Sequence, residues 1–134
     1  MKKRVLIADD DWMFLQLLKF KLKKNGFEVI TAKDEKEFWT HAFDSKPDLI
    51  MIDLLLKNKI GSEVYQTMID FGLAPSVPVV FMSALVDQEE ALILGEEKKT
   101  TYPVFSKLCD LQELINKITA LLDEKTLCHV QEEN

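Results

Sequence analysis

The segment Val5–Asp11 reads VLIADDD, so that four apolar residues run directly into three aspartates. A short continuous apolar run rich in β-formers is typical of a strand that is buried on both faces, as in a parallel sheet. The segment Asp48–Asp53 (DLIMID) repeats this pattern and also ends on an aspartate, and Val79–Met82 is a third such run, followed by Ser83. We therefore expect buried strands whose carboxyl ends carry polar side chains.

Segments with helical periodicity separate these runs. Phe14, Leu18 and Leu22 recur every fourth residue, which predicts an amphipathic helix to about Lys24. Asn25-Gly26 then ends this helix, because glycine readily adopts the left-handed conformation that closes helices. Asp11 either caps this helix or joins a metal site, and we favour the cap.

The remaining elements follow from the same patterns. Leu111 to Leu122 shows the clearest helical spacing, behind a possible cap at Asp110. The other expected elements are a strand at 27–31, a helix from Asp34 through Phe43, a loop at 54–60, helices near 61–71 and 87–94, an edge strand at 101–105 that Pro103 interrupts, and a frayed polar tail at 124–134.

Five strands that alternate with five helices predict βαβ units with right-handed crossovers. The expected fold class is therefore α/β, a doubly wound five-stranded parallel sheet with helices on both faces. One domain spans residues 1–123, and residues 124–134 form a short polar C-terminal tail.

Composition limits the classes of function. The chain has 134 residues, of which 47% are hydrophobic and 30% charged, with a net charge of −6. This composition is typical of a globular domain, and an acidic chain is a poor ligand for phosphate backbones, so we expect no direct nucleic-acid binding. The two cysteines and two histidines have no spacing used by zinc modules. No apolar stretch is long enough for a bilayer, and we expect a cytoplasmic protein without membrane insertion.

In doubly wound sheets the functional crevice lies beyond the carboxyl ends of the strands. Asp9, Asp10 and Asp53 follow two of the predicted strands and should converge there. Their mutual repulsion is relieved by a hard divalent cation, and Mg²⁺ prefers oxygen ligands. We expect Asp10 and Asp53 to bind Mg²⁺ directly, Asp9 to bind through water, and a backbone carbonyl of the following loop, that of Leu55, to complete the protein ligands.

The same end of the sheet supplies the groups for phosphoryl chemistry. A carboxylate carries no proton at neutral pH, so Asp53 can act as a nucleophile without a general base. Lys107 supplies a positive charge and Ser83 a hydroxyl donor for phosphoryl oxygens.

Four pieces of the chain together resemble a response-regulator receiver domain: Val5–Asp11, Pro47–Leu54, Val77–Ala84 and Lys107. The resemblance covers about residues 3 to 123. It implies a flavodoxin-like three-layer sandwich with strand order 2-1-3-4-5. By position, Asp9 and Asp10 match the acidic metal pair, Ser83 the switch hydroxyl and Lys107 the phosphate-contacting lysine.

The resemblance implies Mg²⁺-dependent transfer of a phosphoryl group to Asp53 from a sensor histidine kinase or a histidine phosphotransfer protein. Such a domain is a phosphoacceptor that assists its own phosphorylation and dephosphorylation, and not a turnover enzyme. We expect a stand-alone receiver that switches a downstream protein partner, with a phosphorylation-dependent dimer as a further option.

Two alternatives stay open. Leu108 follows Lys107 where the family usually has proline, and Val104 stands where the family places an aromatic switch residue. These departures favour a receiver-like interaction module that works without phosphorylation. An aspartate-nucleophile phosphohydrolase is the last choice, because Leu55 stands where those enzymes typically carry a second acid.

Overall fold

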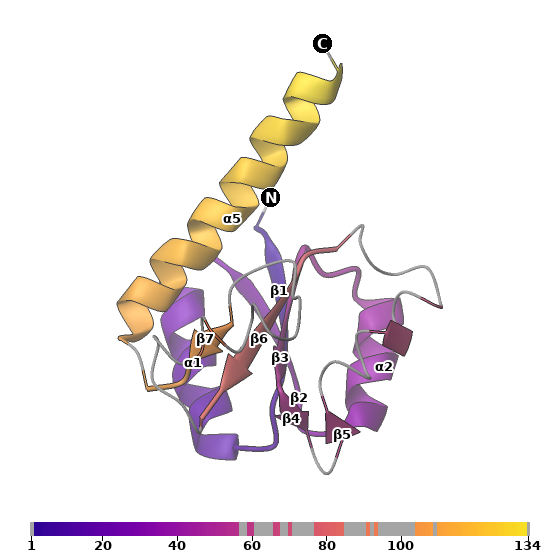
Figure 1. Ribbon diagram of the computed structural model, residues 1–134, viewed down its shortest axis with the longest axis vertical. Helices are drawn as coiled ribbons and strands as arrows, with labels where there is room; N and C mark the ends of the chain where they lie inside the picture. The colour runs from indigo at the N-terminus through magenta and orange to yellow at the C-terminus, as the bar shows by residue number, and fades with distance from the viewer. Residues whose placement is uncertain are drawn as a thin grey trace.

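The central sheet has the predicted strand order. In the computed structural model its parallel strands lie in the order β2-β1-β3-β6-β7 (Figure 1), and the last of them overlaps the edge strand expected at 101–105 only at Phe105. The bounds are β1 Arg4–Ala8, β2 Glu28–Ala32, β3 Leu49–Asp53, β6 Val79–Ser83 and β7 Phe105–Ser106. The structure describes residues 2–56, 59–60, 66–67, 70, 77–84, 91, 93, 104–108 and 110–133, with the backbone alone at 55–56, 59–60 and 124–133.

The strands separate two apolar layers because successive side chains point to opposite faces. In β1, Val5 and Ile7 pack on one face, with residues of α1 (Trp12–Lys24) and α5 (Leu111–Glu133). Leu6 and Ala8 pack on the other face, with residues of α2 (Glu35–Asp44). Figure 1 shows α1 and α5 on one side of the sheet and α2 on the other. The continuous apolar runs are therefore strands that are buried on both faces, as their composition predicted.

Local capping sets the ends of α1 and α2. The Asp11 side chain accepts a hydrogen bond from the backbone N–H of Phe14, so Asp11 is the N-cap of α1, as we favoured. The Asp34 side chain accepts from the N–H of Glu37 in the same way at the start of α2. Gly26, directly after α1, has a φ of +89°, the left-handed conformation expected at a helix end.

The C-terminal segment differs from its prediction. Instead of a frayed polar tail after Leu122, α5 continues as helix to Glu133 and extends past the sheet (Figure 1). The segment contains no glycine or proline, and each residue added to an existing helix gains a backbone hydrogen bond without a new nucleation cost. Across the described residues, no helix is long and apolar enough to span a bilayer.

The stretch after β3 also differs. Residues 54–60 were expected as a loop, but β4 (Leu55–Leu56) pairs antiparallel with β5 (Lys59–Ile60). Two-residue strands are too short to show an alternating pattern in sequence. The helices expected near 61–71 and 87–94 lie mostly outside the described residues, although Gln66, Thr67, Asp70, Ala91 and Ile93 are helical, and residues 101–103 of the expected edge strand also lie outside.

Substitutions at Gly26 test whether the end of α1 depends on a residue in the left-handed conformation. No atom lies within 4 Å of a Cβ added at Gly26, so any cost of Gly26→Ala comes from the backbone conformation alone. We expect Gly26→Ala to lower the free energy of unfolding by about 1 kcal/mol in urea titrations. Gly26→Asn should cost less, because asparagine tolerates this conformation. Equal stability of Gly26→Ala and the wild type would contradict this account of the turn.

Candidate functional site at the carboxyl ends of the strands

The carboxyl edge of the sheet brings together the polar residues that the sequence placed after its strands. Asp53 is the last residue of β3 and lies opposite Met82 of β6. Ser83 ends β6 and lies opposite Ser106 of β7. Lys107 is the residue after Ser106. The N–H of Lys107 donates to the carbonyl of Ser83 over 2.8 Å, which joins the two strand ends.

Three carboxylates converge at this edge. Asp9, Asp10 and Asp53 each offer an oxygen, and these oxygens lie within 4.8 Å of one another. Asp9 is fully buried and Asp53 is largely buried, whereas Asp10 is exposed. Buried carboxylates at this separation are costly unless a positive charge lies among them.

Lys107 supplies such a charge. Its Nζ lies 2.7 Å from Oδ2 of Asp53 and also forms an ion pair with Oδ2 of Asp9. The Lys107 side chain is only 7% exposed, so these ion pairs are little screened by solvent. One ammonium therefore joins the acids that follow β1 and end β3.

Burial and pairing shift the pKa values of Asp9 and Lys107. Burial raises the pKa of Asp9 to about 6, although the hydrogen bonds from Lys107 and from the backbone of Asp11 act in the opposite direction. Burial lowers the pKa of Lys107, but the contacts with Asp53 and Asp9 more than offset this effect, and the pKa is raised overall. Lys107 is therefore a cation at neutral pH, whereas the burial of Asp9 opposes its ionisation.

The first turn of α1 fixes the orientation of Asp9. The backbone N–H of Asp11 donates to Oδ1 of Asp9 over 2.9 Å. Asp11 in turn caps α1 through the N–H of Phe14, over 3.2 Å. Oδ2 of Asp9 is buried and pairs with the ammonium of Lys107.

The donor set fits a hard divalent cation. Three carboxylate oxygens within 4.8 Å, two of them from buried residues, are the kind of ligands that Mg²⁺ takes from proteins. Asp9, Asp10 and Asp53 would hold such an ion. The backbone carbonyl of Leu55, in β4 two residues after Asp53, stays a predicted ligand.

Two contacts, one of Lys107 and one of its chain neighbours, were not predicted from the sequence. The ring of Phe14 lies with its centroid 5.0 Å from Nζ of Lys107, although the sequence indicated only a place for Phe14 in the apolar stripe of α1. The Ser106 hydroxyl accepts from the N–H of Leu108 over 3.0 Å. Phe14 lies one helical turn after Asp11, so its nearness to the acidic edge was the signal that could have identified it.

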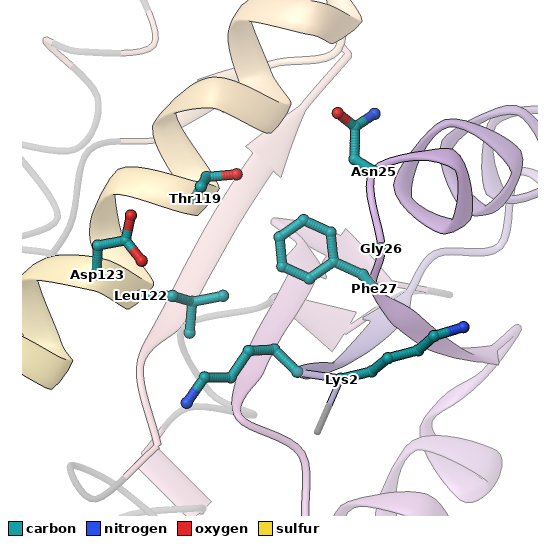
Figure 2. Close-up of a pocket in the computed structure, with 8 residues that line it drawn as sticks. Lys2, Asn25, Gly26, Phe27, Thr119, Leu122 and Asp123 are labelled. Carbon is teal, nitrogen blue, oxygen red and sulfur yellow. The ribbon is translucent and has the colours of Figure 1, made fainter.

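A pocket at the other end of the sheet lacks these features. It measures about 440 Å³ and lies near the amino ends of β1 and β2, between the turn after α1 and one side of α5 (Figure 2). Among its described lining residues Asp123 is the one acid, with Lys2 and Lys3 as the cations. The convergent carboxylates therefore identify the opposite, carboxyl edge as the candidate site.

Comparison with known proteins agrees with this geometry. Residues 5–119 match the family described as the response regulator receiver domain. The chain is 35% identical over 97 residues to the alkaline phosphatase synthesis transcriptional regulatory protein PhoP of Bacillus subtilis. This match covers 72% of the chain but 39% of PhoP, so the chain corresponds to about two-fifths of that relative.

Solved structures show the same fold. The receiver domain of the Francisella response regulator 1452 is 27% identical, with a TM-score of 0.77 over 92% of this chain and 99% of that one. A CheY-like receiver domain protein from Methanospirillum hungatei is 24% identical, with a TM-score of 0.78 over 94% and 98% of the two chains.

Because the pKa of Asp9 is raised in the folded protein, the ionisation of Asp9 should lower the free energy of unfolding as the pH rises. The unfolded chain releases this proton near pH 3.8 and the folded chain near 6, so stability falls as the pH rises between these values. With a chelator present, Asp9→Asn should therefore be more stable than the wild type at pH 7.5, by up to about 3 kcal/mol, and this difference should fall to about half at pH 5. Thermal unfolding at both pH values measures this difference.

Asp10→Asn, which removes an exposed carboxylate of the same cluster, is the matched control. It should change stability less than Asp9→Asn at both pH values. If Asp9→Asn is the less stable protein at pH 7.5, the pairing of ionised Asp9 with Lys107 outweighs the cost of its burial, and the account is wrong.

Proposed function

Because the chain belongs to the response-regulator receiver family, we propose that it accepts a phosphoryl group on Asp53 in a Mg²⁺-dependent reaction and thereby switches a protein partner. The observation that carries the proposal is the ion pair of Lys107 with Asp53 beside two further carboxylates. This arrangement combines a nucleophile, a cation for phosphoryl oxygens and oxygen ligands for a metal. The proposed donor is a phosphohistidine of a sensor histidine kinase or of a histidine phosphotransfer protein.

The transfer needs little proton chemistry from the protein. An oxygen of Asp53 forms the new bond to phosphorus while the phosphorus–nitrogen bond of phosphohistidine breaks, and the electron pair stays on the imidazole. Mg²⁺ bound by Asp9, Asp10 and Asp53 would supply charge neutralisation for the phosphoryl oxygens. Positioning and electrostatic stabilisation then account for most of the catalysis, as in other phosphoryl transfers.

Lys107 has the central role in the response to phosphorylation. Its ammonium already contacts Oδ2 of Asp53, so it can pass to a phosphoryl oxygen on the same residue with a small movement. Ser83, at the end of the neighbouring strand, is the proposed hydroxyl donor to the same group. Phosphorylation adds about −1.5 to −2 charges, which would draw both groups inward. The proposed result is a change in the surface presented to a downstream partner or to a second copy.

Intact mass spectrometry after incubation with Mg²⁺ and acetyl phosphate tests this function. We expect one added phosphoryl group on the wild type, and none on Asp53→Asn or in the presence of a chelator. Asp44→Asn, which removes an exposed carboxylate at the end of α2, should still take up the group. The absence of any adduct on the wild type would reject the switch and support the interaction module that works without phosphorylation.

A further inference from the structure

We propose that Phe14 is a positioning residue that holds the Lys107 ammonium against the acidic edge of the sheet. The inference rests on the proposed function, since it names the residue that prepares Lys107 for a phosphoryl group. The direct observation is the position of Nζ of Lys107, 5.0 Å from the centroid of the Phe14 ring. A cation at this distance over an aromatic face is attracted by the ring quadrupole, and more strongly when it is removed from water.

The contact closes a ring of interactions around the site. Asp9 accepts from the N–H of Asp11, Asp11 accepts from the N–H of Phe14, the Phe14 ring contacts Lys107, and Lys107 pairs with Asp9. Each of these interactions therefore restrains the position of the next residue in the ring. The capping of α1 thereby restrains both the acid and the ring that contact the ammonium.

The ring is held in place by the core. Phe14 is partly buried and packs against the apolar layer that α1 and α5 form with the sheet. The backbone beside Lys107 is held separately, by the Lys107 N–H on the Ser83 carbonyl and the Leu108 N–H on the Ser106 hydroxyl. These bonds fix the start of a long, flexible side chain, and the ring restricts where its far end can lie.

Another lysine–phenylalanine pair on the same helix provides a contrast. Nζ of Lys24 lies 5.1 Å from the ring centroid of Phe20, but Phe20 is 57% exposed, and the two residues are one helical turn apart. That pair is an ordinary surface contact. Lys107 comes from the other end of the chain and is 7% exposed, so its contact with Phe14 joins distant elements in a buried site.

The first test is the rate of phosphorylation by acetyl phosphate in excess Mg²⁺. We expect Phe14→Leu to react about 3- to 30-fold more slowly than the wild type, because leucine retains apolar volume without an aromatic face. Phe14→Trp should restore most of the rate, and Phe20→Leu should react like the wild type. In a Lys107→Met background, Phe14→Leu should cause no further loss, which separates action through Lys107 from a general structural effect.

The second test needs no phosphorylation. In NMR spectra of the protein with ¹³C-labelled lysine, the Hε protons of Lys107 should be shifted upfield by the ring. This shift should be lost in Phe14→Leu and retained in Phe20→Leu. An unchanged Lys107 resonance or an unchanged rate in Phe14→Leu overturns the inference, as does a further loss of rate in the Lys107→Met background. If the wild type takes up no phosphoryl group, the proposed function fails, while the NMR shift still decides whether Phe14 holds Lys107.

Discussion

The carboxyl edge of this sheet depends on one ammonium placed between two buried acids. Lys107 pairs with Asp9 and Asp53, which come from neighbouring strands and would repel each other without it. Its raised pKa keeps this cation charged, whereas burial raises the pKa of Asp9. The interaction therefore links the tertiary structure to the chemistry, since the charge that stabilises the acidic edge is also the charge that a phosphoryl group would attract.

The sheet provides the rigid frame for this interaction. Strands that are buried on both faces end at one edge of the sheet. Residues that are distant in sequence therefore lie close together there, on backbone that the core holds in place. The first turn of α1 adds the fine orientation, because Asp11 both caps the helix and donates to Asp9. The acidic site is in this way supported by the capping of α1, whose Phe14 ring lies beside the Lys107 ammonium.

Much of this arrangement could be predicted from sequence, because local patterns encode it. The runs Val5–Ala8 and Leu49–Asp53 indicated buried strands, and the aspartates at their ends indicated where the site lies. The contact of Phe14 with Lys107 was not predicted, because an apolar residue in a helical stripe indicates core packing, and only its place one turn after Asp11 pointed to the acidic edge. The continuation of α5 to Glu133 was also missed, because a polar composition suggested a tail where no residue actually breaks the helix.

We propose that the Lys107 ammonium, held beside Asp53, contacts an oxygen of a phosphoryl group on that residue. A crystal structure with Mg²⁺ and beryllium fluoride, which mimics a phosphoryl group on aspartate, tests it most directly. The account predicts beryllium fluoride on Asp53, the metal among Asp9, Asp10 and Asp53, and Nζ of Lys107 within hydrogen-bond distance of a fluorine. A structure with beryllium fluoride bound at Asp53 but Lys107 turned to solvent, or with no ligand at the acidic cluster, would contradict it.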